Sequence, residues 1–429
     1  MNSVTVKCVK FGDSSTIKID NHQLIIDCGS DSRGNNMTSS EFAYSAIAND
    51  LYNDNQTDLL ITHFHKDHFN GILNIPELQR KLTNVYLPYS IIQGENIYAG
   101  AISKLLVLAS PHSWGFRLSS NIINLFLKLE CVVLNPTNIK FVRAGDTISI
   151  ANKTIRVLWP DCTFDIAGLK TVESNVKYIS TDTKEVIETQ TQISEDFAPT
   201  LGTMFERLKN EYDELINDIR SQGYDSGEIE SSQWILNSEL EKYLGELHSL
   251  KNKDGNNNYD NSKLQNAYTN SRKANQHLWS FISNNELLTM KIKNFSRNQY
   301  HSLINTMNAL SIVCDLEEQF VYLGDVPGDV IGHINSSFRA YYQVVKLQHH
   351  GTKDYYTNLT PKGAHYIVSN GGYSRRKVGK QFITSLDNGL IFCTNAHEAA
   401  NEYCSYYADL GRCKETCVKL SGKKVIQFK

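Results

Sequence analysis

Short runs in which apolar and polar residues alternate open the chain and predict consecutive β-strands. Three such runs, "VTVKCVKF", "STIKID" and "QLIIDCGS", lie within the first 30 residues. The turn-type segment "GDSS" separates the first two. The next segment, "SEFAYSAIANDLY", has apolar residues at helical spacing, and its Ser-Ser-Glu start suits a helix N-terminus. The chain therefore begins as mixed β and α structure.

The same mixture continues to about residue 160, where residues 139–160 have the pattern of three strands joined by turns. Between residues 165 and 300 no strand pattern follows, and apolar side chains recur at helical spacing. In the first part of this stretch they are Met204, Phe205, Leu208, Tyr212, Leu215, Ile216 and Ile219. Strand patterns resume after residue 300, and "CVKLSGKKVIQF" at the end predicts a hairpin around Ser421–Gly422.

Strands mixed with helices in this way predict an α/β fold. A length of 429 residues leaves room for a large domain with an insertion. We expect two α/β halves, residues 1–164 and 301–429, on either side of a helical insertion at 165–300.

Composition limits the binding partners and the cellular compartment that we expect for this protein. The net charge of −3 excludes a uniformly basic surface, so contact with a polyanion requires a local patch or a metal. No window of about 18 apolar residues occurs, so no membrane partner or span is expected. The N-terminus lacks an apolar signal core, and the nine cysteines are scattered and odd in number. These features predict reduced thiols and a cytoplasmic protein.

The stretch "ITHFHKDHFNG" carries the densest set of metal-binding side chains, directly after the apolar end of the predicted strand "TDLLITH". His63 and His65 are two residues apart and would point the same way from the end of a strand. Asp67 and His68 would follow at the start of the next helix. The four side chains can serve two neighbouring metal ions. Imidazole suits zinc, and mixed imidazole and carboxylate sets also admit manganese.

This stretch resembles the HxHxDH signature of the metallo-β-lactamase superfamily. Three further segments, "LIIDCGS", which precedes this stretch, and "VYLGDV" and "VVKLQHHGT", which follow it, resemble other landmarks of the superfamily and occur in the same order. Together with "IRVLWP", "NALSIV" and "IVSNGG", they are most similar to one branch: the soluble nuclease-like domain of ComEC/Rec2 DNA-uptake proteins and its stand-alone relatives. The resemblance covers about residues 3–160 and 305–400 and leaves out the predicted insertion.

The resemblance implies a metallo-β-lactamase αββα four-layer sandwich with a large helical insertion. It also implies two divalent metal ions, with zinc preferred and manganese as the alternative. The implied ligands are His63, His65, Asp67, His68, Asp325 and His350. His350 is chosen over His349 because it directly precedes the glycine at the strand end. Asp27, His112 and His349 remain candidates for metal binding or for hydrogen bonding to the ligands.

For function, the resemblance implies a metal-dependent phosphodiesterase or nuclease that acts on DNA or RNA through a metal-bound hydroxide. Asp67 would orient the hydroxide and accept its proton. The basic residues Arg375, Arg376 and Lys377, in "YSRRKVGK", are expected to contact substrate phosphate, although a charge run can equally be a solvated loop.

Two other hypotheses stay open. One is hydrolysis of a small substrate, such as a cyclic nucleotide or a lactam-like ester or amide. The other is a partner-binding subunit that docks a second protein through the helical insertion. The fold alone cannot choose, because one scaffold hosts many chemistries. A role in bacterial defence or nucleic-acid processing is a further hypothesis.

Overall fold

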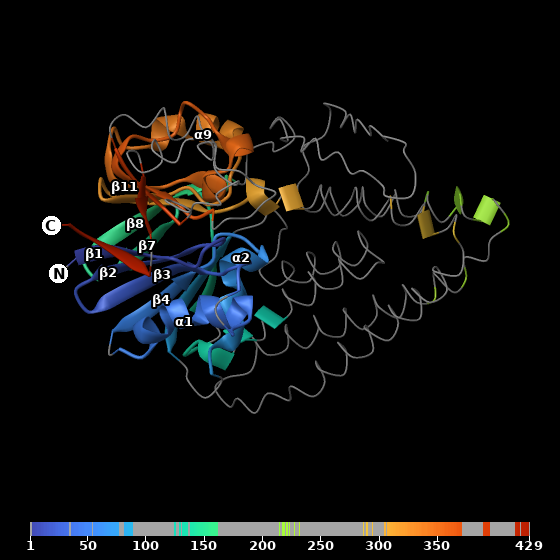
Figure 1. Cartoon of the computed structure of the whole chain (residues 1–429), viewed down its shortest axis with the longest axis horizontal. Coiled ribbons are helices and arrows are strands. Elements are labelled where there is room, and N and C mark those ends of the chain that lie inside the picture. The colour runs from blue at the N-terminus through green and yellow to red at the C-terminus, as the bar shows by residue number, and fades with distance from the viewer. Residues whose placement is uncertain are drawn as a thin grey trace.

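The computed structural model contains two mixed β-sheets that face each other (Figure 1). The described residues are 2–33, 36–53, 55–76, 81–88, 138–161, 307–370, 389–394, 417–420 and 422–428, with scattered positions within 124–135, 214–231 and 286–305.

The first sheet combines an antiparallel half with a parallel half. Its strands lie in the order β15 (Lys423–Phe428), β1 (Asn2–Lys7), β2 (Ser14–Ile19), β3 (His22–Cys28), β4 (Gln56–Leu60), β5 (Leu82–Pro88) and β6 (Ile139–Val142). Pairing is antiparallel from β15 to β3 and parallel from β3 to β6.

The second sheet has the same mixed character. Its strands lie in the order β14 (Cys417–Lys419), β13 (Leu390–Cys393), β12 (Gly363–Val368), β11 (Tyr342–Lys346), β10 (Phe320–Tyr322), β9 (Val313–Leu316), β8 (Lys153–Trp159) and β7 (Thr147–Ile150). Pairing is parallel from β14 to β10 and antiparallel from β10 to β7. The predicted mixed α/β class is thus confirmed.

Alternation of side chains along the strands produces two hydrophobic cores. Leu24 and Ile26 of β3 join one core cluster with Val344 of β11, on the facing sides of the sheets. Ile25 and Val345 point the other way and belong to the second cluster. These strands are therefore apolar on both faces, which explains why they appear in the sequence as continuous apolar runs.

The helix α1 (Ser39–Leu51) packs against the first sheet on the face away from the second (Figure 1). A capping box starts it: the Glu41 backbone N–H donates to Thr38 Oγ1, and the Thr38 N–H donates to the Glu41 carboxylate. Its buried residues are Ala43, Ile47 and Leu51, at a spacing of four.

The shorter helices follow individual strands. They are α2 (Lys66–Phe69), η1 (Asn70–Asn74), α9 (Gly328–His333), η4 (Asn335–Ser337), η5 (Gln348–Gly351) and η6 (Lys353–Tyr355). α9 lies on the outer side of the second sheet (Figure 1). The complete four-layer sandwich stays a prediction, because much of the chain between the strands lies outside the described residues.

The predicted insertion at 165–300 also lies outside the described residues, apart from scattered positions. The domain boundaries at 164 and 300 therefore stay predictions. Within the described part of the chain, no helix combines the length and apolar character needed to cross a membrane.

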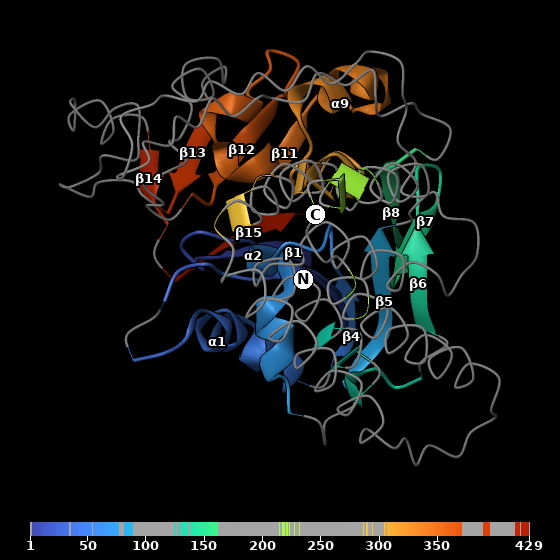
Figure 2. The same cartoon turned by 90° about the vertical axis from the view of Figure 1, so that its right-hand side faces the viewer.

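The predicted C-terminal hairpin is wrong. β14 pairs with β13 in the second sheet, whereas β15 pairs with β1 in the first (Figure 2). Two strand patterns that are close in the sequence need not pair with each other, because the spacing does not specify the partner of each strand. Here β15 covers the edge of β1, which would otherwise present unpaired backbone groups.

β15 also contributes to the core between the sheets, and this contribution can be tested. Ile426 and Phe428 are 6% and 8% exposed, whereas Val425 on the same strand is 43% exposed. We expect Ile426→Ala to lower the free energy of unfolding by about 2–5 kcal/mol, because it leaves a cavity. Val425→Ala, the matched control, should lower it by less than about 1 kcal/mol. Urea unfolding measures both, and equal losses would contradict this placement of β15.

Candidate metal centre

A cluster of buried histidines and carboxylates lies where loops from the two sheets meet. In the first sheet, Asp27 ends β3, and the segment with the HxHxDH motif follows β4. In the second sheet, Asp325 follows β10, and His350 follows β11. The carboxyl ends of neighbouring parallel strands share one edge, so residues far apart in the sequence converge there.

Close backbone packing fixes the HxHxDH segment. A Cβ atom on Gly29 would lie 2.2 Å from the Asp67 carbonyl carbon and the His68 nitrogen, so only glycine fits. The next residue, Ser30, donates its backbone N–H to Asn70 Oδ1 at 3.0 Å, and Asn70 Nδ2 donates to the Ser30 carbonyl at 2.7 Å. The loop after β3 thus positions α2 and the side chains at its start.

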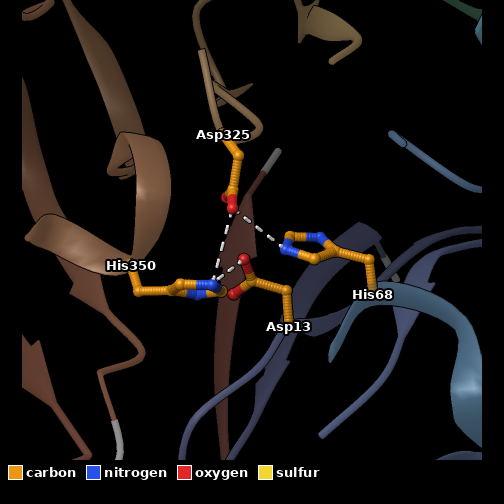
Figure 3. Close-up of side chains that lie close together, drawn as sticks. All are labelled: Asp13, His68, Asp325 and His350. Carbon is orange, nitrogen blue, oxygen red and sulfur yellow. Dashed lines mark ion pairs between the residues drawn. The ribbon is translucent and has the colours of Figure 1, made fainter. Parts of the chain in front are cut away.

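The Asp325 carboxylate points toward His68 and His350 (Figure 3). Its Oδ2 atom lies 3.4 Å from His68 Nε2, 3.6 Å from His350 Nε2 and 3.7 Å from His63 Nε2. These distances exceed the usual hydrogen-bond range. Two ligand atoms bound to one tetrahedral zinc ion at about 2.0–2.1 Å lie roughly 3.4 Å apart. The distances thus match neighbouring ligands of a metal ion better than hydrogen bonds.

The cluster divides into two donor groups that share Asp325. One contains Asp13, His68, Asp325 and His350, and its ligand atoms lie within 4.8 Å of one another. The other contains His63, His65 and Asp325 within the same limit. Asp67 adjoins the first group, with its Oδ2 3.1 Å from His350 Nε2. A carboxylate common to two groups is the arrangement in which one residue bridges two ions.

Several ligand atoms also lack hydrogen bonds. Among the described residues, the Nε2 atoms of His63 and His68 and both carboxylate oxygens of Asp325 are buried without one. Leaving such an atom unsatisfied costs about 1–3 kcal/mol, and more if it is charged. Divalent cations bound between these atoms would satisfy them, so the residues present fit a metal centre.

Asp27 fixes the orientation of the His68 ring by a hydrogen bond. Its Oδ2 accepts from His68 Nδ1 at 2.8 Å and from the Tyr322 hydroxyl at 2.8 Å, and its Oδ1 accepts from the Thr62 backbone N–H at 2.8 Å. Both oxygens are therefore engaged by protein groups. Of the two roles left open by the sequence, the geometry favours orientation of a ligand imidazole over direct metal binding.

Asp13 contacts the Nδ1 atom of His350 in the way that Asp27 contacts His68. Sequence analysis did not identify Asp13. Its Oδ2 lies 3.3 Å from His350 Nδ1, and its Oδ1 accepts from the Ser369 hydroxyl at 2.6 Å and from Lys346 Nζ at 2.8 Å. Although Asp13 lies close enough to join the donor group, these partners occupy both oxygens. It therefore suits the orientation of His350 better than metal binding. The available signal was its Gly-Asp pair at a strand end, as at Asp325.

Burial and neighbouring groups shift the pKa values of His63 and Asp325. Burial, reinforced by the neighbouring His68 and His65, holds the pKa of His63 well below its ordinary value. Burial opposes the charged form of Asp325, but His68 and His350 outweigh it and hold the pKa of this carboxyl well below its usual range. His63 is thus neutral, as a metal ligand must be, and Asp325 stays ionised near neutral pH.

The structure brings together all six residues named as ligands from the sequence: His63, His65, Asp67, His68, Asp325 and His350. That they bind metal stays a prediction. His349 is also buried, with its Nε2 3.7 Å from Asp325 Oδ2. His112, Arg375, Arg376 and Lys377 lie outside the described residues, so their roles stay predictions as well.

Comparisons with known proteins add little to this geometry. No protein-family model matches the chain, and no curated protein matches it. Among solved structures, the chain is similar to MEM-A1, a subclass B3 metallo-β-lactamase isolated from a soil metagenome library, with 20% identity and a TM-score of 0.22. The match covers 36% of this chain and 49% of that one. A TM-score this low does not place the chain in that family.

Removing the shared carboxylate and one imidazole tests the metal centre. We expect the parent protein to carry close to two equivalents of zinc or manganese, and the double variant His68→Ala/Asp325→Ala to lose at least one. His365→Ala, which changes a half-buried histidine on β12, is the control and should keep both. Elemental analysis after gel filtration measures the content. Equal metal in the double variant and the parent would refute the assignment.

Proposed function

We propose that this chain is a metal-dependent hydrolase of the metallo-β-lactamase superfamily, and that it acts as a phosphodiesterase or nuclease on DNA or RNA. The observation that carries the proposal is the buried Asp325 carboxylate, which two donor groups of histidines share. The order of the sequence motifs, and their likeness to the ComEC/Rec2 nuclease-like domain, supports the choice of a phosphodiester substrate.

Sites with two metal ions recur among phosphatases and nucleases because both oxygens in a displacement at phosphorus carry negative charge. Two divalent ions, when bound, would supply positive charge for these oxygens and acidify a water molecule. Within the described residues, the donor set of imidazoles and carboxylates suits zinc first and manganese second. No serine or cysteine nucleophile is needed for this chemistry.

Asp67 is the residue placed to handle the attacking water. It is 8% exposed, whereas Asp325 is 1% exposed, so solvent reaches it more readily. Burial opposes its charged form, but the His350 hydrogen bond and the nearby His68 outweigh burial and lower the pKa of this carboxyl. An ionised Asp67 accepts a hydrogen bond from water and orients it. The ionised carboxylate is also the state in which Asp67 could accept a proton from that water.

The role of Asp67 gives a direct test. Asp67→Asn keeps the shape of the side chain and should keep the fold and most of the metal. We expect hydrolysis of bis-p-nitrophenyl phosphate to fall about 10²–10⁴-fold, because the neutral amide cannot accept a proton from the water. Glu317→Gln, at the exposed turn between β9 and β10, is the matched control and should keep the parent rate.

A parent protein that cleaves no phosphodiester with zinc, manganese or magnesium would contradict the proposal. The substrate screen should include single-stranded and double-stranded DNA, RNA and cyclic nucleotides. If the protein cleaves cyclic nucleotides alone, it is a hydrolase of small substrates and the nuclease proposal is wrong.

Polynucleotide binding is tested through the basic segment. Replacing Arg375, Arg376 and Lys377 with Gln should weaken binding of long polynucleotides at low salt and scarcely change cleavage of bis-p-nitrophenyl phosphate. The loss should shrink as salt rises, because counterions released from the phosphates supply that affinity. Fluorescence anisotropy across a salt series measures it.

The control for net charge replaces three lysines at strand ends opposite the metal centre, namely Lys18, Lys140 and Lys153. Equal losses in the two triple variants would show that total charge, rather than the basic segment, determines binding.

A further inference from the structure

We propose that three exposed cations beside the metal centre, Lys10, Arg33 and Lys66, bind the phosphate groups of a polynucleotide strand as it crosses the site. We call these residues the basic rim. The inference rests on the proposed function and deepens it, because it assigns substrate contacts to residues outside the metal centre. The three cations lie in separate segments of the sequence, so no charge run marks them.

Three segments of the first sheet form one wall beside the metal centre. The Asp31 backbone N–H donates to the Phe11 carbonyl at 2.9 Å, which joins the loop after β3 to the loop before β2. The Asp13 N–H donates to the Asp67 carbonyl at 3.1 Å, which joins the loop before β2 to the start of α2. The Phe11 ring also lies against His350, with ring centroids 4.6 Å apart. Each residue of the basic rim belongs to one of these segments, so the rim borders the candidate metal ligands.

Lys66 stands between His65 and Asp67 in the sequence, at the start of α2. Its side chain is 45% exposed, and its Nζ lies 3.4 Å from Oδ1 of Asp31, whose side chain is 34% exposed. Burial and then the charge of Asp67 raise the pKa of the Asp31 carboxyl, so the two carboxylates are near enough to interact. The exposed Lys66 ammonium is therefore held near Asp67, the residue placed to orient the attacking water.

Lys10 and Arg33 lie together on the same wall. Lys10 Nζ donates to the Arg33 carbonyl at 3.3 Å and lies 5.7 Å from the centroid of the Phe42 ring. Lys10 has a φ of 61°, a left-handed conformation that non-glycine residues keep where their surroundings enforce it. The Arg33 side chain is exposed, and it makes no hydrogen bond or ion pair in the described part of the chain. Its guanidinium donors are therefore available to a ligand.

Positive charge exceeds negative charge along this wall. The three cations meet one exposed carboxylate, Asp31, because Asp13 is 1% exposed and paired with Lys346. The whole chain has a net charge of −3, so the basic rim is a local patch of the kind that contact with a polyanion requires. A lysine ammonium attracts phosphate as a point charge, and an arginine guanidinium can bind two phosphate oxygens at once. The rim thus has the chemistry of a phosphate-binding surface.

Attachment of the loops to one another gives the competing explanation. The Lys66–Asp31 pair and the Lys10 hydrogen bond would then serve only to hold the loops in place. Ion pairs as exposed as Lys66–Asp31 contribute little to stability. The two explanations differ in one measurable respect. Phosphate contacts make the binding of polynucleotides depend on salt, whereas contacts between loops affect the free energy of unfolding.

The salt dependence of polynucleotide binding is the test, measured by fluorescence anisotropy with a labelled single-stranded oligonucleotide. The full chain with Asp67→Asn serves as the reference protein, because it should bind the strand without cleaving it. In this background, we expect Lys10→Gln/Arg33→Gln to weaken binding about 10-fold at low salt. The slope of log affinity against log salt should also shrink by about 1.4, because each phosphate contact on a single strand contributes roughly 0.7.

Matched variants separate charge from structure. Lys10→Arg/Arg33→Lys keeps both charges and should keep the reference slope. Lys18→Gln/Lys140→Gln, at strand ends opposite the metal centre, removes the same charge and should also keep it. Adding Lys66→Gln to Lys10→Gln/Arg33→Gln should shrink the slope by about 0.7 more. Lys66 adjoins two candidate ligands, so the double variant decides the inference if the triple variant loses metal. Thermal unfolding and elemental analysis check the fold and metal content of each variant.

An unchanged slope in Lys10→Gln/Arg33→Gln would overturn the inference and leave attachment of the loops as the role of these residues. Equal losses in Lys18→Gln/Lys140→Gln would overturn it as well, because total charge would then determine binding. A reference protein that binds no oligonucleotide would also overturn it. The expected slopes, together with a parent that cleaves no phosphodiester, would support the basic rim and refute only the proposed function. A parent that cleaves phosphodiesters, together with unchanged slopes, would refute only the rim.

Discussion

The buried carboxylate of Asp325 is the constraint on which the site depends. It is ionised and 1% exposed, and neither oxygen accepts a hydrogen bond from the described residues. A charge in this position is costly unless cations surround it. Its backbone is fixed independently, because the Asp325 N–H donates to the Ser311 hydroxyl. Gly324, at a φ of 54°, leaves no room for a side chain beside Ser311. The fold thus holds one negative charge at the meeting point of several imidazoles.

A ring of polar groups around the cluster keeps those imidazoles in place. Asp27 and Asp13 each engage the Nδ1 atom of one histidine, and each is itself held by partners from the other sheet, Tyr322 for Asp27 and Lys346 for Asp13. The two sheets are therefore linked through the site as well as through the apolar core between them. Replacing Asp27 or Asp13 should therefore affect the orientation of His68 or His350 more than the packing of the sheets.

Asp325 and Asp67 differ in exposure, and this difference suits them to different roles. Asp325 is buried and belongs to both donor groups, which suits a residue that would hold metal. Asp67 is more accessible and stays ionised, which suits a residue that orients water for attack. Such a division allows hydrolysis without a protein nucleophile, and it leaves the choice of substrate to the loops around the site. This is why a substrate screen, rather than the site geometry, distinguishes a nuclease from a hydrolase of small molecules.

The sequence by itself predicted the mixed α/β class and, through its resemblance to the metallo-β-lactamase motifs, named Asp325 and the five residues that lie near it. Apolar periodicity and the HxHxDH spacing are local properties of the chain, whereas Asp325 and His350 were named from the order of the superfamily motifs that the sequence resembles. It could not determine that β14 and β15 join different sheets, because a turn does not encode strand partners. Nor could it show that Asp13 supports His350, or that His349 faces Asp325. Those contacts depend on strands brought together from opposite ends of the chain and on the left-handed backbone at His349 and His350, which only the packed structure enforces.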